Sequence, residues 1–271
     1  MNFLLEPLAY QFMQRGLLAS VIVGVLCAVM GTYVVLRGMA FLGDAMAHAI
    51  LPGVAVAYLF GGNLLLGAGA AAILVALSIG FFSRQGDVKE DTAIGILFAA
   101  ALSLGVAMIS TMQTYAVDLS HILFGNVLGV SSSDLWMIAI ISLIILLMVG
   151  LFYKPFLVIS FDPVLAATLR LPAELLRNLM LVLLALTVVV SLQTVGVSLA
   201  AAMLVTPAAT AYLLTRRLGP MMLVSAAIGA FSSVIGLYLS YYFNIVSGSA
   251  IVLTATVLFL LGFLWKRTKS I

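Results

Sequence analysis

Nine apolar stretches divide the chain, and a polar turn or loop separates each from the next. They cover residues 17–36, 41–60, 64–82, 92–112, 134–152, 178–195, 197–214, 221–243 and 249–265. The hydrocarbon core of a bilayer is about 30 Å thick, and about 20 helical residues are needed to cross it. The pattern predicts an all-α polytopic membrane protein with about eight to nine transmembrane helices.

Two further segments are not predicted to span the bilayer. Residues 119–130 are apolar but too short, so we expect a short re-entrant or outer-surface helix there. Residues 153–177 form the longest polar loop. Within this loop, Asp162 followed by Pro163 is a strong helix start, and Pro172 ends the helical pattern.

Composition limits the class of protein. Hydrophobic residues make up 65% of the chain and charged residues 8%, whereas a soluble domain is roughly half apolar and a quarter charged. This balance excludes a water-soluble globular protein. Cys27 is the only cysteine, so the chain has no internal disulfide and no cysteine-based metal cluster. Because no linker or repeat marks a boundary, residues 1–271 are predicted to form one transmembrane domain.

The placement of Lys and Arg predicts the orientation in the membrane. Short loops rich in these residues usually remain in the cytoplasm. On this rule the cytoplasmic side holds the C-terminus, the loop with Arg216 and Arg217, the segment 153–177, the segment 84–91 and the turn at Arg37. The uncharged turns 61–63 and 244–248 are placed outside the cell.

Asp44 and His48 are the most informative polar residues, because they lie four positions apart in an otherwise apolar span. Four residues are about one helical turn, so both side chains share one helix face and can bind one cation. Pro52 lacks an N–H and leaves the carbonyl of His48 without its helical donor. Carboxylate, imidazole and carbonyl together suit manganese, iron or zinc. A structural ion pair is the alternative, although ionisable residues inside a membrane domain are functional by default.

A second polar stretch, residues 191–211, contains small residues that permit close helix packing. Pro207 predicts a kink in this stretch, because it frees a backbone carbonyl. Gln193 and Thr206 are further candidates for lining an ion pathway. Hydrogen bonding between neighbouring helices explains the same residues equally well.

The chain has no Gly-x-x-x-x-Gly-Lys-Ser/Thr phosphate loop, so any ATP-driven work must come from another subunit. The chain itself is predicted to be a transport protein and not an enzyme. The short helix between Asp162 and Pro172 is marginal in isolation and needs a surface to lie on. The membrane face and a docked cytoplasmic partner are the two candidates for that surface.

Three motifs, in this order, make the chain resemble the permease subunits of the ABC importers for manganese, zinc and iron. They are Gly-Asp-x-x-x-His-Ala at 43–49, Asp-Pro…Leu-x-Leu-Pro at 162–172, and Gln-Thr-Val-Gly…Leu-Val-Thr-Pro-Ala-Ala-Thr-Ala at 193–211. The resemblance covers nearly the whole chain. It implies that Asp44 and His48 lie on the metal pathway.

The same resemblance implies that the loop helix is a coupling helix that fits a groove of the ATPase. The expected contact residues are Asp162, Pro163, Leu165, Leu169 and Arg170. The family commonly has glycine where this chain has Arg170, and this departure bears on how the ATPase docks. The other partners implied are a second permease copy in a homodimer, two copies of the ATPase subunit, an extracytoplasmic metal-binding protein and membrane lipid, with no nucleic acid.

The transported ion is expected to be a divalent metal, and no cofactor is expected to be bound permanently. Met39-Ala40-Phe41, His48-Ala49 and Pro52-Gly53 resemble the manganese members of the family, so manganese is favoured and zinc or iron is the alternative. The rival class is an ion-coupled secondary transporter or channel with Asp44 and His48 as a proton relay. Its signature, paired broken helices in two related halves, is not seen in the sequence.

Overall fold

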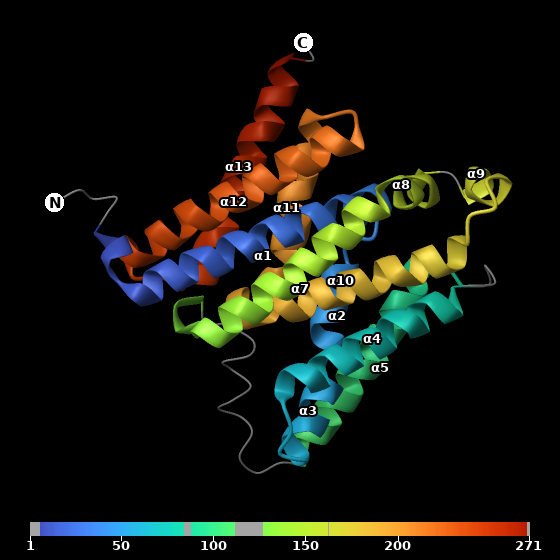
Figure 1. The fold of residues 1–271 in the computed structure, drawn as a ribbon, viewed down its shortest axis with the longest axis horizontal. Coiled ribbons are helices and arrows are strands. Elements are labelled where there is room, and N and C mark those ends of the chain that lie inside the picture. Colours follow the sequence, from blue (N-terminus) through green and yellow to red (C-terminus); the bar gives the residue numbers. More distant parts are fainter. Residues whose placement is uncertain (1–5, 84–87, 112–126, 162, 270–271) are drawn as a thin grey trace.

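Helices make up all the regular structure in the computed structural model, which describes residues 6–83, 88–111, 127–161 and 163–269. Two single turns of 3-10 helix, η1 and η2, accompany the α-helices (Figure 1). The elements are η1 (Pro7–Ala9), α1 (Gln11–Leu36), α2 (Leu42–Ala49), α3 (Leu51–Leu59), α4 (Leu64–Phe82), α5 (Glu90–Ser110), η2 (Val127–Gly129), α7 (Ser132–Leu151), α8 (Tyr153–Phe161), α9 (Pro163–Thr168), α10 (Ala173–Val195), α11 (Val197–Leu214), α12 (Leu218–Phe243) and α13 (Ser247–Lys269).

Eight helical units in the described ranges are long and apolar enough to cross a membrane. They are α1, α2 together with α3, α4, α5, α7, α10, α12 and α13, while α11 contains a shorter apolar helix. The predicted fold class is confirmed, and the chain is a multi-pass membrane protein. Helix α1 begins at Gln11 and α10 at Ala173, earlier than the apolar stretches at 17 and 178. Both helices begin before the apolar stretch because a helix can extend outside the hydrocarbon core of the membrane.

The span predicted at 41–60 is two helices and not one. Helix α2 ends at Ala49 and α3 begins at Leu51, with Ile50 between them. Pro52 lies in the first turn of α3, where the missing N–H removes no helical hydrogen bond. The proline explains why the break falls just before it. As a result, Asp44 and His48 lie on the short helix α2, and Pro52 lies on the next one.

Helix α1 packs against α7, α10, α11 and α12, and Figure 1 shows it running between α12 and α7. Glycines permit the closest of these approaches. A Cβ atom on Gly31 would overlap the carbonyl oxygen of Leu204 in α11, and one on Gly24 would lie 2.8 Å from the carbonyl oxygen of Gly229 in α12. Small residues at such positions let helix backbones come together inside a membrane.

Polar contacts bring together the helix ends that we assign to the cytoplasm. Arg37, the residue after α1, forms an ion pair of 2.6 Å with Glu90 at the start of α5. Arg177 in α10 donates hydrogen bonds to the carbonyl oxygens of Gly80 and Ser83 at the end of α4, at 2.7 and 3.2 Å. Arg37 also donates to the sulfur of Met180 in α10 at 3.9 Å, so the ends of α1 and α4 and the starts of α5 and α10 lie on one side of the molecule.

The loop at 153–177 holds two helices where the sequence predicted one. Helix α8 follows α7 directly, and α9 comes after it at one end of the molecule (Figure 1). The predicted start, Asp162, lies outside the described residues, and α9 ends at Thr168, before Pro172. The early end has a local cause. Arg170 adopts a left-handed backbone with φ of 54°, and the N–H of Leu171 donates to the carbonyl of Ala166 at 3.0 Å, which is a Schellman-type helix end.

Only the last part of the predicted outer segment at 119–130 is described. Val127–Gly129 form the turn η2, which packs against α1 beside Gly16. Residues 112–126 lie outside the described residues, so the re-entrant or outer-surface helix stays a prediction.

The orientation predicts the result of reporter fusions. Green fluorescent protein, which is active in the cytoplasm, should be active after Arg217 or Lys269, because these positions follow the most basic segments. Alkaline phosphatase, which is active outside the cytoplasm, should be active when it is inserted at 244–248. Alkaline phosphatase and green fluorescent protein fusions measure the two states, and reversed activities would contradict the assigned sides.

Replacing Arg170 with glycine should stabilise the end of α9. A residue with a Cβ in the left-handed region costs roughly 1–2 kcal/mol, and glycine removes this cost. Hydrogen exchange in the intact protein should show the Leu171 amide protected about fivefold more strongly in Arg170→Gly. Thr168→Gly, inside α9, is the control and should lower that protection. Unchanged or weaker protection in Arg170→Gly would contradict the assignment of strain to this position.

Candidate metal pathway

Asp44 and His48 lie on one face of α2, as their spacing requires. The Nε2 atom of His48 is 3.7 Å from Oδ1 of Asp44, and the two side chains are 26% and 41% exposed, respectively. This separation is too long for a strong direct hydrogen bond. Two ligand atoms that each lie about 2.1 Å from one ion are roughly 3.0–3.5 Å apart at octahedral and tetrahedral angles. A small side-chain rotation brings the pair into that range.

The surroundings of α2 hold this face in place. The ring of His48 lies against Phe98 of α5, with centroids 5.9 Å apart, and Phe98 meets Phe41 edge-on at 5.5 Å. On α2 itself, a Cβ on Gly43 would lie 3.4 Å from the Cα of Ala201 in α11. The candidate ligands are therefore carried on a helix that is packed between α5 and α11, with further contacts to α10.

The number of ionisable ligands at this site is small. Within the described ranges, no group of three or more His, Cys, Asp or Glu side chains is placed to hold one metal ion. Cys27 is buried in α1. Asp44 and His48 therefore offer two ligands, and an ion bound there takes its remaining ligands from neutral oxygen atoms, water or a second molecule. Such a shell suits a transported ion, because a site that must release its ion cannot bind it too tightly.

Pro52 does not leave the carbonyl of His48 unused. The backbone N–H of Ile50, at the break between α2 and α3, is directed to that carbonyl oxygen. Pro52 itself packs near α5, where a Cβ on Gly105 would lie 3.1 Å from the proline nitrogen. Its clearest structural effect is the break, which ends α2 one residue after His48.

The remaining pathway candidates lie on α10 and α11. Gln193 belongs to the last turn of α10, and its side chain lies outside the described residues. Pro207 is buried inside α11, and the hydroxyl of Thr210 donates to the carbonyl of Thr206 at 2.8 Å. Leu204, on the same helix, lies 3.7 Å from an ideal Cβ on Gly43. The structure thus puts α11 beside α2, but it records no direct contact of Thr206 or Pro207 with Asp44 or His48 among the described residues.

Sequence reasoning missed a second polar cluster, formed by Arg37, Glu90, Arg177 and Asn178. Burial lowers the pKa of the Arg37 guanidinium from its usual range, and the carboxylate of Glu90 opposes that shift. Three buried atoms, Oε1 of Glu90, Nε of Arg177 and Oδ1 of Asn178, have no hydrogen-bond partner in the described structure. Removing one member of a buried ion pair leaves the other charge uncompensated, so loss of either Arg37 or Glu90 alone destabilises the fold.

The sequence carries only a weak signal for this cluster. Arg37 and Glu90 are 53 residues apart, and Arg177 lies 87 residues beyond Glu90. The common feature is their assignment to cytoplasmic helix ends by the charge rule. That rule predicts a shared side of the membrane but no contact.

The exposed face of α9 is the third part of the candidate machinery. Ala166 is buried, whereas Val164, Leu165 and Leu169 are 76%, 44% and 55% exposed. Arg170, at the end of this helix, is also exposed. An apolar face on a helix outside the predicted spans is typical of a surface that another molecule covers.

A bundle of membrane-spanning helices, with a carboxylate and an imidazole between its helices and an exposed short helix at one end, defines an integral membrane transport protein. The ABC 3 transport family matches residues 9–266 of the chain. The chain belongs to this family.

Named relatives and a solved structure agree with that membership. "Manganese transport system membrane protein MntC" of Listeria monocytogenes is 50% identical over 271 residues, which cover all of this chain and 96% of the relative. A "Probable iron transport system membrane protein" of Haemophilus influenzae is 41% identical and covers 99% of this chain and 98% of its own length. The structure described as "PsaBC from Streptococcus pneumoniae in complex with Fab" has a TM-score of 0.85 at 40% identity and covers 96% of this chain and 94% of its own.

Proposed function

We propose that the chain is the permease subunit of an ATP-driven importer that carries divalent manganese into the cytoplasm. The observation that carries this proposal is the position of Asp44 and His48, 3.7 Å apart on a short helix between α5 and α11. An ionised carboxylate in a membrane domain is expensive unless it faces a partner or a water-filled path. A cation that passes between the two side chains provides such a partner.

The donor set favours manganese, iron or zinc over softer ions. A carboxylate and an imidazole are available, whereas the thiol of Cys27 is buried in a different helix. Among these three ions, manganese is supported by the name of the relative that is 50% identical, and iron by the name of one that is 41% identical. We therefore place manganese first and iron or zinc second.

The energy source in this proposal is a cytoplasmic ATPase subunit, present in two copies, that docks on α9. Leu165 on α9 and Leu169 just after it supply an exposed apolar patch, and Arg170 adds a positive charge at its edge. Helix α10 begins at Ala173, shortly after α9, and carries Arg177, which holds the end of α4. A displacement of α9 is thereby passed on to α4, and through the neighbouring Arg37–Glu90 pair to α1 and α5.

Two further partners complete the proposal. Membership of the transport family supports an extracytoplasmic protein that delivers the metal, and we add to it a second permease copy in a homodimer. The shortage of ionisable ligands around Asp44 and His48 leaves room for ligands from outside the described chain.

Asp44→Asn should abolish manganese uptake while leaving the fold intact. The amide keeps the size and hydrogen-bonding capacity of the carboxylate but loses its negative charge, so we expect uptake to fall roughly tenfold or more. His48→Ala should have the same effect. Radiolabelled manganese uptake, normalised to the amount of folded permease in the membrane, measures the change.

The matched control is Asp91→Asn, which removes an exposed carboxylate from the first turn of α5 and should leave uptake unchanged. A merely structural Asp44–His48 pair gives a different pattern. In that case the variants would lower the amount of protein, but each surviving molecule would still transport at the normal rate, and that outcome would overturn the metal site.

Replacing Leu165 and Leu169 together with aspartate should release the ATPase subunit. Two charges on the apolar face of α9 cannot be buried in an interface without a large desolvation penalty. Co-purification of the complex and metal-stimulated ATP hydrolysis measure the loss, and membrane insertion should be unaffected. Leu175→Asp, which adds a charge to an exposed position on α10, is the control and should keep the ATPase bound. Full retention and normal hydrolysis in the double variant would exclude α9 as the docking site.

A further inference from the structure

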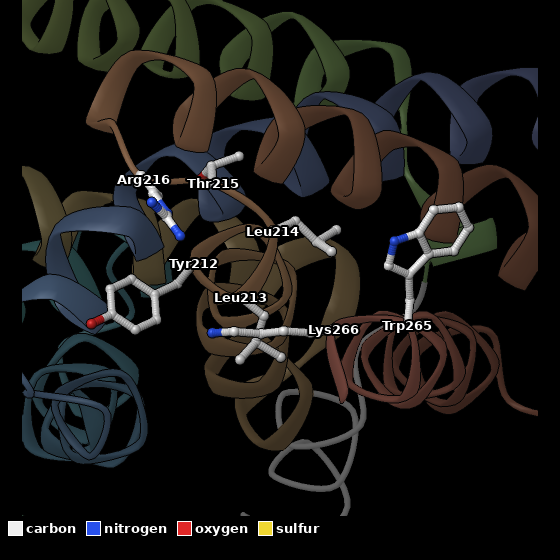
Figure 2. A pocket seen from close by; sticks show the side chains of 7 residues that line it. All are labelled: Tyr212, Leu213, Leu214, Thr215, Arg216, Trp265 and Lys266. Atoms are coloured by element: carbon white, nitrogen blue, oxygen red, sulfur yellow. The ribbon is translucent and has the colours of Figure 1, made fainter. Parts of the chain in front are cut away.

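A pocket of about 410 Å³ lies between the end of α11 and the last turns of α13 (Figure 2). Tyr212, Leu214 and Arg216 line it on one side, and Trp265 and Lys266 line it on the other. In Figure 2 the guanidinium of Arg216 and the ammonium of Lys266 both point toward the side of the pocket where Tyr212 lies. Its size falls in the range of small-ligand sites.

The charge of this pocket is not balanced by the chain. Neither Arg216 nor Lys266 forms an ion pair within the part of the chain that the structure describes, and both are exposed. In the sequence, no Asp or Glu follows Glu174. The carboxyl end of α11 contributes the equivalent of about half a negative charge, which two full positive charges outweigh. The pocket therefore favours an anionic ligand.

The approach to the pocket is apolar. Leu260, Leu261 and Leu264 on α13 are 52%, 57% and 56% exposed, and Leu214 beside the pocket is 47% exposed. Trp265 and Tyr212 flank the charged groups, as aromatic residues do at the boundary between hydrocarbon and headgroups. A ligand that matches this surface has an anionic end and an apolar tail.

We propose that this pocket binds the headgroup phosphate of an anionic phospholipid from the cytoplasmic leaflet, with the acyl chains lying along the exposed leucines of α13. Basic pockets on the cytoplasmic side of membrane helices are suited to such headgroups. The ATPase is a less suitable occupant, because Figure 1 places the end of α13 well apart from α9. The site does not depend on the identity of the transported metal.

The test uses the fluorescence of Trp265 in the full-length chain reconstituted in phosphatidylcholine bilayers. The chain has two tryptophans, so Trp136→Phe leaves Trp265 as the only one. Bilayers contain a small, equal fraction of brominated phosphatidylglycerol or brominated phosphatidylcholine, because bromine quenches a tryptophan that it touches. Two cations at an anionic surface predict that phosphatidylglycerol is preferred on the order of tenfold.

Two double variants test whether the pocket residues cause the preference for phosphatidylglycerol. Arg216→Gln with Lys266→Gln should remove the preference. Arg217→Gln with Arg267→Gln, which removes two exposed neighbouring charges that do not line the pocket, should keep it. Equal loss in both double variants would show a diffuse surface charge and overturn the site.

Three other results would also overturn the proposal, and none of them needs a substitution at the pocket. Equal quenching by the two brominated lipids would mean that the pocket does not select a headgroup. Absence of quenching by either lipid would mean that a second copy of the chain or another subunit covers it. Loss of the preference on adding inorganic phosphate at about 1 mM, which is far below the effective concentration of a headgroup confined to the bilayer, would identify a site for a soluble anion and not for a lipid.

Discussion

Placing a charged carboxylate inside a membrane domain costs free energy, and the packing around Asp44 and His48 is organised around that cost. Asp44 and His48 lie on a helix of only eight residues, and that helix is held on both sides by neighbours. Gly43 faces Ala201 of α11, and Phe98 of α5 lies against the imidazole. Gly31 in turn brings α1 directly onto α11 at Leu204. The small residues of this region thus let α2 pack closely against its neighbours while Asp44 and His48 stay partly exposed on one of its faces.

A small number of polar contacts also holds the helix ends together at the predicted cytoplasmic face. There one ion pair joins the end of α1 to the start of α5, and two arginine-to-carbonyl hydrogen bonds join the start of α10 to the end of α4. Several atoms of this cluster are buried without partners, which leaves it only partly satisfied. Because the hydrogen bonds of Arg177 start from the first turns of α10, the cluster lies between the short helix α9 and the helices that surround Asp44 and His48.

The spans, their number and their approximate bounds could be predicted from the sequence, because apolar length is a direct physical requirement of the bilayer. The spacing of Asp44 and His48 similarly predicted a shared helix face. The break at Ile50 was not predicted as a break, because a proline at position 52 fits a kinked helix as well as the first turn of a new one. Helix α8, which precedes α9 in the loop at 153–177, was missed because its apolar run is too short to stand out as a span.

Other features depend on contacts that no local pattern contains. The pairing of Arg37 with Glu90 joins residues 53 positions apart, and charge placement predicts only that both face the same side. Arg170 is instructive in a different way. The resemblance marked its position as one where glycine is common, and the structure supplies the reason, since its φ of 54° lies in the region that glycine adopts most easily.

Electron spin echo spectroscopy of Mn²⁺ bound to the purified permease tests whether the ion binds between Asp44 and His48. A directly bound imidazole nitrogen modulates the echo of the paramagnetic ion. We expect nitrogen modulation in the natural chain and its loss in His48→Gln, which retains His121, the other histidine of the sequence. Persistence of the same modulation in His48→Gln would rule out the site between Asp44 and His48, because the ion would then take its nitrogen ligand from elsewhere.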